Sequence, residues 1–382
     1  MIAARRRLGI LVVALAAAVV PAACSPPRAL EAMRVLADLD AGAGPSGLKE
    51  ATPAPSRASV AYSVDGRARV GDIYRPGDEA RAALVLVPGA AEAGKDDARL
   101  VAFATTLARA RFVVLVPDIA SLRALHVRAA DAREVADAIL HLAGRGDGAA
   151  GRRLGVVAIS YAVGPAVIAA LEADVRDRLH FVVGVGGYYD IEAVVTFFTT
   201  GYFRPRPGAP WRHVEPNAYG KWVFVLSNLE RVRDASDRAA LEAMARRKLD
   251  DLAADLADLV AGLGPEGRAF HALLANAEPE RVPALIAALP GDVRAEMAAL
   301  DLARRDLRSL EARLLLVHGR EDDIIPWSES QALAAAAPEG RADLFLVDGF
   351  SHVDPSAGRP DRFQLWRAVY RLLELRDEAP AT

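Results

Sequence analysis

Short apolar runs alternate with helical stretches over the first half of the chain. In each run the apolar residues are consecutive, as expected for a strand buried on both faces, and in each following stretch they recur at helical spacing. The predicted strands are 84–87, 112–116, 155–159 and 181–185, and the predicted helices are 100–109, 130–142 and 162–173. This alternation predicts the α/β class, with a mostly parallel sheet flanked by helices.

Two further patterns complete the predicted sheet. Apolar and polar residues alternate over 60–64 and 68–73 around Asp65-Gly66, which predicts a β-hairpin at the start of the globular part. The strand and helix rhythm returns near the end of the chain. There the predicted strands are 314–317 and 344–347, and the predicted helices are 329–336 and 362–375.

Residues 191–309 interrupt this rhythm. The one candidate strand there is 222–226, whereas Leu249, Leu252, Leu256 and Leu259 recur at helical spacing and predict a core-facing stripe on one helix. We interpret 191–309 as a helical cap inserted between two parts of the core, 57–190 and 310–378.

The first residues have the pattern of an export signal. Arg5, Arg6 and Arg7 precede the apolar run 8–20, which as a helix would reach only about 20 Å, short of a hydrocarbon core of about 30 Å. We therefore predict a signal peptide over 1–23.

Cys24, the single cysteine, follows the small residues Ala22 and Ala23. This resembles the bacterial lipoprotein cleavage box, which implies that Cys24 is lipidated and that the protein is anchored to a membrane of the cell envelope. An ordinary secretory signal with a stray thiol is the alternative, leaving a periplasmic or secreted protein. Residues 24–56, rich in Ala, Pro and Gly, are interpreted as a lipidated N-terminus and linker with one possible helix at 29–39.

Composition narrows the function classes. The 382 residues include 47 Lys and Arg against 50 Asp and Glu, a net charge of −3, so the chain has no excess of cations to neutralise nucleic-acid phosphates. A single cysteine excludes an internal disulfide and cysteine-based metal sites. The sequence indicates no cofactor and no metal.

A candidate nucleophile lies where predicted strand 155–159 meets the next helix. Ser160 occupies that junction, with Ala158 two residues before it and Ala162 two residues after it. A serine raised above a sheet edge by a sharp turn requires small residues at those two positions. A serine that merely caps a helix also fits, so this segment leaves both roles open.

Candidate acid and base residues follow the last two predicted strands. Asp322 and Asp323 lie in the loop after strand 314–317, and His352 lies just past strand 344–347. Of the seven histidines, only His352 follows Asp322 in the chain. A serine, an acid and a histidine at the ends of buried strands form the constellation of a nucleophilic triad.

These segments resemble the α/β-hydrolase superfamily. The stretch from His318 through Asp322 to Pro326 is similar to its H-G-x-x-D-x-x-[VI]-P segment, which implies that Asp322 is the triad acid, and the chain order Ser160, Asp322, His352 also matches. Other segments look like bacterial dienelactone-hydrolase-like members, although those enzymes carry Cys as nucleophile. The resemblance covers 57–190 and 310–378 and implies an α/β-hydrolase fold with a cap.

The resemblance also implies the oxyanion-hole donors. The family places one donor where the first parallel strand ends, here Pro88-Gly89-Ala90, and another on the residue after the nucleophile. The backbone N–H groups of Ala90 and Tyr161 are therefore expected to meet the oxyanion.

The implied activity is serine hydrolysis of a small-molecule carboxylic ester, thioester or amide. A serine nucleophile argues against dehalogenase and epoxide-hydrolase chemistry, which use a carboxylate at this position of the fold. An acyltransferase using the same triad is one alternative. A non-catalytic envelope lipoprotein that uses the fold for binding is another.

Aromatic residues gather at the start of the predicted cap. Ten of the 23 aromatic residues lie between positions 188 and 224. Because chain inserted there can cover the serine, this density suggests an apolar substrate pocket, although the rings could equally form the core of the cap itself. The pocket candidates are Tyr188, Tyr189, Phe197 and Phe198.

Overall fold

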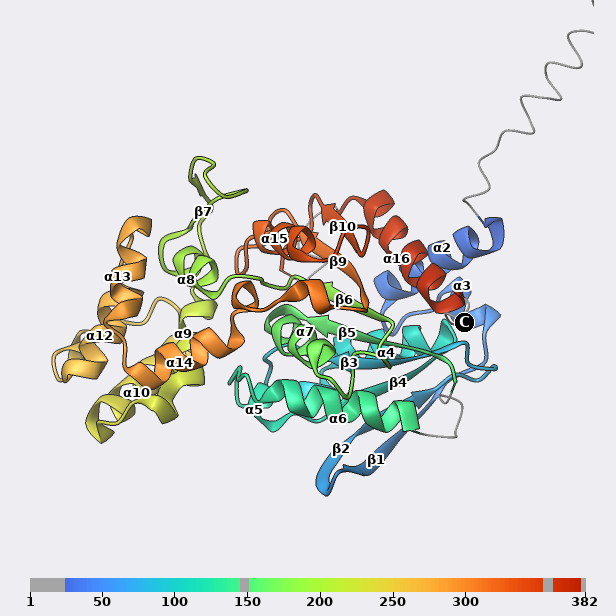
Figure 1. The fold of residues 1–382 in the computed structure, drawn as a ribbon, viewed down its shortest axis with the longest axis horizontal. Coiled ribbons are helices and arrows are strands. Elements are labelled where there is room, and N and C mark those ends of the chain that lie inside the picture. Colours follow the sequence, from blue (N-terminus) through green and yellow to red (C-terminus); the bar gives the residue numbers. More distant parts are fainter. Residues whose placement is uncertain (1–24, 145–150, 353–359, 379–382) are drawn as a thin grey trace, which may run out of the picture.

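An eight-stranded sheet forms the centre of the computed structural model, which describes residues 25–144, 151–352 and 360–378 (Figure 1). The predicted signal peptide and Cys24 lie outside these ranges. The strand order is β1-β2-β4-β3-β5-β6-β9-β10. The strands are β1 (Ser56–Val64), β2 (Arg67–Arg75), β3 (Ala82–Val87), β4 (Phe112–Pro117), β5 (Arg153–Ile159), β6 (Phe181–Val185), β9 (Arg313–Gly319) and β10 (Ala342–Val347).

The sheet is parallel from β4 to β10, and the hairpin β1–β2 joins it in antiparallel pairing through β2 and β4. Each predicted strand of the two core parts is present. The prediction of a mostly parallel sheet is therefore confirmed, because consecutive apolar residues mark these strands locally in the sequence.

Helices cover both faces of the sheet. Along β3, Val85 and Val87 pack into one apolar cluster and Leu84 and Leu86 into another, since successive side chains point to opposite faces. The first cluster includes residues of α6 (Asp131–Gly144), α7 (Val163–Leu171) and α15 (Ser328–Ala336). The second includes residues of α2 (Pro26–Ala41), α4 (Ala98–Arg109) and α16 (Arg362–Asp377).

The chain between β6 and β9 forms a helical lobe beside the sheet (Figure 1). Residues 222–226 lie in a helix, not in a strand. Their apolar run is part of an amphipathic pattern that buries Trp222, Val223, Val225 and Leu226. The lobe contains α8 (Ile191–Thr200), the short pair β7 (Tyr202–Phe203) and β8 (Arg212–His213), α9 (Tyr219–Asn228), α10 (Ala235–Asp250), α11 (Ala257–Val260), α12 (Pro265–Leu274), α13 (Val282–Ala287) and α14 (Gly291–Leu300).

The predicted leucine stripe does not lie on one helix. Helix α10 contains Leu249 and ends at Asp250, and α11 contains Leu259 and begins at Ala257, so Leu252 and Leu256 lie between the two helices. Leu252 is 45% exposed. Helical spacing alone misled here because the sequence contains no strong stop signal at the end of α10.

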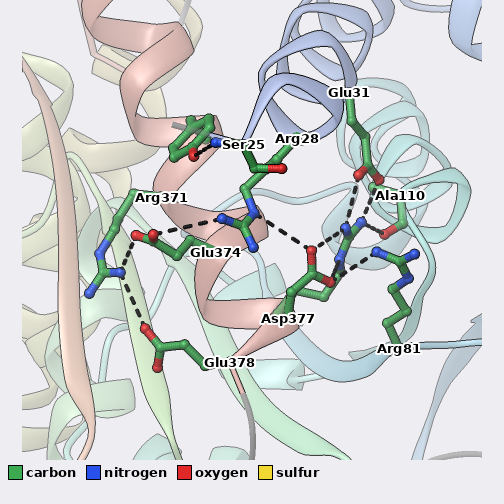
Figure 2. A network of polar contacts seen from close by, with 11 residues as sticks. Ser25, Arg28, Glu31, Arg81, Ala110, Arg371, Glu374, Asp377 and Glu378 are labelled. Atoms are coloured by element: carbon green, nitrogen blue, oxygen red, sulfur yellow. Dashed lines mark hydrogen bonds and ion pairs between the residues drawn. The ribbon is translucent and has the colours of Figure 1, made fainter. Parts of the chain in front are cut away.

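The segment interpreted as a linker is instead folded onto the core. Helices α2 and α3 (Gly47–Ala51) bury Ala32, Val35, Leu36 and Leu48. Figure 2 shows the polar network that joins α2 to α16. At its centre the fully buried Arg376 donates from Nη2 to Glu31 at 2.9 Å. These partners are 345 positions apart in the chain, so composition near the N-terminus could not reveal the contact.

Within the described ranges, no helix has both the length and the apolar character needed to cross a membrane.

The ion pair between α2 and α16 gives a stability prediction. Glu31→Gln should lower the free energy of unfolding by about 1–3 kcal/mol, because it weakens the charge-assisted bonds to a buried guanidinium. Urea unfolding followed by circular dichroism measures this. The matched control is Glu50→Gln on exposed α3 surface, which should change stability by less than about 0.5 kcal/mol. Equal values for the two variants would contradict the prediction.

Candidate active site

A strained turn presents Ser160 at the end of β5. Its backbone φ is +57°, a left-handed conformation that costs a non-glycine residue roughly 1–2 kcal/mol. Ala158 and Ala162 are fully buried on either side, so larger side chains would find no room. A β-carbon at Gly164 would lie 1.9 Å from the Tyr188 hydroxyl, and the helix that follows the turn can pack there only with glycine. This is the geometry expected of a nucleophile elbow.

The structure brings Ser160, His352 and Asp322 together in one hydrogen-bonded chain. Ser160 Oγ lies 2.7 Å from His352 Nε2, and His352 Nδ1 lies 2.7 Å from Asp322 Oδ2. Because an ionised carboxylate can only accept, Nδ1 carries the proton and Nε2 is left to accept from the serine hydroxyl. The three residues come from three separate strand ends, after β5, β9 and β10.

Asp322 is buried and held in place by several donors. Its Oδ1 accepts from the backbone N–H groups of Ile324 and Ile325, at 2.9 and 2.8 Å. Burial alone would raise the pKa of Asp322, but His352 and His318 lower it to well below its usual range. The carboxylate therefore stays charged beside the imidazole.

His318 supports this loop. Its side chain is completely buried, with Nε2 2.9 Å from the carbonyl of Ile325 and 3.2 Å from Asp322 Oδ2. Nδ1 lies 2.7 Å from the Ser330 hydroxyl. In the sequence, His318 and Asp322 are four positions apart. This spacing indicates a contact only when the strand is already known to end between the two residues.

Asp323, the other candidate acid, has a different hydrogen-bond partner. Its backbone carbonyl accepts from the N–H of Asn217 at 2.7 Å. Burial and the neighbouring Asp322 raise its pKa. It is Asp322 whose carboxylate contacts the imidazole of His352.

The segment that carries the first predicted oxyanion donor passes beside the serine. A β-carbon at Gly89 would lie 3.3 Å from Cβ of Ser160, so the end of β3 passes directly beside the nucleophile and Ala90 follows at once. The Tyr219 hydroxyl donates to the Ala90 carbonyl at 3.0 Å, which fixes a peptide group next to the site. Tyr161, the second predicted donor, begins the turn after Ser160 and is buried.

An apolar cavity of about 60 Å³ lies between the core and the cap. Tyr161 lines it from the core, and carbon atoms make up nearly all of its wall. Tyr188 and Phe198, two of the four pocket candidates, also line it. The other lining residues are Val127, Ile191, Val194, Val195, Gly220, Val223, Phe224, Ser227, Asn228, Glu296, Met297 and Leu300.

The remaining two candidates lie elsewhere. Phe197 packs against Phe203, with ring centres 5.8 Å apart, in a separate cluster with Trp327. Phe197 lies on the side of α8 that faces this cluster, whereas Phe198 lies on the side that faces the cavity. Tyr189 is partly buried, and its backbone N–H donates to Glu329 at 3.0 Å. The aromatic density thus serves both the cavity and the core of the lobe.

Glu329 is an unpredicted buried carboxyl near the site. It lies at the start of α15, and its Oε2 accepts from the N–H groups of Tyr189 and Asp190, at 3.0 and 2.8 Å. Burial raises its pKa to about 8 despite these two bonds, with Asp190 and Asp301 adding to the increase. Glu329 therefore joins α15, the helix that follows the loop carrying Asp322, to the entry of the cap.

In the described ranges, no three His, Cys, Asp or Glu side chains are grouped so that they could hold a metal ion.

Comparisons by sequence give limited matches. No family model matches the chain. Among curated proteins, the uncharacterized protein YfhR of Salmonella typhi and of Salmonella typhimurium is 41% identical over 46 residues. This segment is 12% of the chain and 15% of the Salmonella protein, so most of that protein's length is unmatched.

Comparisons by structure extend over nearly the whole chain. A protein described as a hydrolase, from Legionella pneumophila, has a TM-score of 0.58 at 13% identity, covering 92% of this chain and 96% of that one. The alpha/beta hydrolase GrgF from Penicillium has a TM-score of 0.50 at 16% identity, covering 84% and 98%. The chain has the α/β-hydrolase fold, as its sequence predicted.

The two neighbouring acids give a prediction for the site. Asp322→Asn should slow the modification of Ser160 by a fluorophosphonate probe by about ten-thousandfold, because the imidazole loses its orienting charge. Asp323→Asn, the matched control, should slow it by less than about tenfold. Gel fluorescence against time gives both rates. A larger effect at Asp323 would show that the acid is assigned to the wrong position.

Glu329 gives a prediction about pH. Its folded-state pKa of about 8 lies above the ordinary value of 4.5, so between these values the folded state keeps a proton that the unfolded chain loses. The stabilisation this provides is complete below about pH 4.5 and disappears as the pH rises toward 8. As the pH rises from about 4.5 to 8, the melting temperature of the wild type should therefore fall more than that of Glu329→Gln. The exposed Glu339→Gln should melt in parallel with the wild type; a parallel curve for Glu329→Gln would refute the assignment.

Proposed function

We propose that the protein is a serine hydrolase that cleaves a carboxylic ester, thioester or amide through an acyl-enzyme. The observation that carries this proposal is the continuous chain from Ser160 Oγ through His352 to Asp322, with both contacts at 2.7 Å. A neutral serine is a poor nucleophile, and a base within hydrogen-bond reach, oriented by a third group, is what activates it.

The geometry supports a two-stage reaction. Ser160 Oγ attacks the substrate carbonyl as its proton moves to His352 Nε2, and Asp322 stabilises the resulting imidazolium. His352 then gives that proton to the leaving alcohol, thiol or amine as the carbonyl bond to the leaving group breaks. A water molecule repeats the attack on the acyl-enzyme, losing its proton to His352, and the acid is released as Ser160 regains a proton.

Backbone donors are proposed to stabilise the charge that develops on the carbonyl oxygen. The proposed donors are the N–H groups of Ala90, which follows Gly89 beside the serine, and of Tyr161, the residue after the nucleophile. Donors fixed before the reaction cost no reorganisation when charge appears. The bond from Tyr219 to the Ala90 carbonyl supports this role, because it holds the neighbouring peptide group in one orientation.

The cavity supports a substrate with an apolar group next to the reacting carbonyl. Tyr161 lines it directly after the nucleophile in the chain, and the cap supplies most of the remaining wall. An apolar wall gains free energy from burying hydrocarbon and would penalise an unpaired polar group. We therefore propose that the small-molecule substrate places an apolar acyl or aromatic group between the core and the cap.

We further propose that the protein is exported and held at a bacterial envelope membrane by a lipid on Cys24. The basic residues 5–7, the apolar run 8–20 and the small residues before Cys24 support this proposal. Cys24→Ser should move the protein from the membrane pellet to the soluble fraction of cells, as an immunoblot would show. Ser25→Ala is the matched control and should remain in the pellet. Unchanged partitioning of Cys24→Ser would count against lipidation.

The hydrolase proposal has a direct test that does not require the substrate. A fluorophosphonate probe should modify Ser160 in the purified protein, identified by mass spectrometry of the labelled peptide. Ser160→Ala should abolish both labelling and turnover, the latter by as much as about a millionfold. Ser63→Ala on the exposed surface of β1 should react like the wild type. Ester hydrolysis retained by pure Ser160→Ala, or no adduct on the wild type, would overturn the proposal.

A further inference from the structure

The N-terminal end of the described chain is fixed at one place on the body. The backbone N–H of Ser25 donates to the Tyr370 hydroxyl at 2.9 Å, and Arg28 lies 3.6 Å from the carboxylate of Asp377 on α16. Figure 2 shows Ser25 and Arg28 at this place, with Arg28 directed toward Asp377. Because α2 begins at Pro26, two residues after Cys24, whatever holds Cys24 also holds the α2–α16 side of the molecule.

The outer surface of these two helices carries unusual apolar exposure. Among the described residues, five large apolar side chains are strongly exposed, and three of them lie here: Leu30 at 48%, Met33 at 58% and Phe363 at 64%. Leu30 and Met33 are three residues apart on α2, so they share one face of the helix. We call the surface formed by Leu30, Met33 and Phe363 the α2–α16 face.

Phe363 connects the two helices at this face. Its ring stacks on Trp366, with centres 5.7 Å apart and planes at 18°. The indole N–H of Trp366 donates to the carbonyl of Ala29, the residue before Leu30. The ring of Tyr370 follows, 5.6 Å from that of Trp366. Aromatic side chains with one polar end are favoured where hydrocarbon meets water.

Cations border the apolar side chains. Arg34 and Arg367 are exposed, and each lies one helical turn from an exposed apolar residue of its own helix. Arg362 is paired with Asp40 and adds no net charge. Exposed apolar and aromatic side chains bordered by arginine are typical of helices that lie in the plane of a membrane with anionic lipids.

We propose that the α2–α16 face is the surface with which the protein rests on an anionic lipid bilayer. The chain itself indicates this occupant, because Cys24, the proposed site of the lipid anchor, lies two residues before α2. The proposal rests on the membrane anchorage proposed above and is independent of the triad. This contact would add to the hold of the acyl chains proposed on Cys24. It also fixes which side of the hydrolase core faces the membrane.

Site-specific quenching tests this proposal on the full chain. The purified protein is reconstituted into vesicles of phosphatidylethanolamine and phosphatidylglycerol that contain nitroxide-labelled acyl chains. Met33→Cys and Phe363→Cys carry an environment-sensitive fluorophore. Val70→Cys and Leu252→Cys are matched controls, because those two side chains are the remaining strongly exposed large apolar residues, at 52% and 45%. The chain without an introduced cysteine, treated with the same fluorophore, shows how much of the label attaches to Cys24.

The expected result is quenching roughly threefold or more stronger at positions 33 and 363 than at 70 and 252. Equal quenching at the four positions overturns the proposal. The proposal is also overturned if fluorescence at positions 33 and 363 changes with the density of protein on the vesicles and not with the nitroxide lipid. That result would indicate contact with a second copy of the chain. Failure of the protein to float with the vesicles also overturns the proposal. Fluorophosphonate labelling of Ser160 in the same samples reports separately on the hydrolase proposal.

Discussion

The left-handed backbone of Ser160 is the constraint on which the site depends. A serine in an ordinary extended conformation would continue β5 and place its hydroxyl on one face of the sheet, inside an apolar cluster. The turn at φ +57° instead carries Oγ to the end of the strand, within 2.7 Å of His352. The strain, roughly 1–2 kcal/mol, is small compared with the packing that enforces it, because β5 and the helix after the turn are buried along most of their length.

A second constraint is the charge on Asp322. A buried carboxylate is stable only when its oxygens are satisfied, and here two backbone N–H groups, His352 and His318 share that task. The conformation of the loop after β9 therefore directs its hydrogen-bond donors at a single carboxylate, that of Asp322. This explains why the acid and not its neighbour Asp323 meets the imidazole: the turn that supplies the two N–H groups can enclose only one of two adjacent side chains.

The sequence predicts those features that depend on residues close together in the chain, and it does not predict those that depend on distant ones. The strands and the sharp turn at Ser160 are predicted from consecutive residues, and both are present. The helix at 222–226, the choice between Phe197 and Phe198, and the folding of the N-terminal segment depend on partners far away in the chain. Glu31 and Arg376 are the clearest case, since neither residue has a local pattern that indicates a buried pair.

The cap is joined to the core at the segments that carry the reacting groups. The Tyr219 hydroxyl bonds the Ala90 carbonyl beside the predicted oxyanion donor, and Asn217 bonds the carbonyl of Asp323, directly after the acid. Glu329, seven residues past that acid, bonds the chain where it enters the cap. A shift of the cap would therefore move the peptide group after Ala90 and the loop that carries Asp322, as well as the cavity wall. The insertion therefore contacts the segments that carry the proposed catalytic residues as well as lining the cavity.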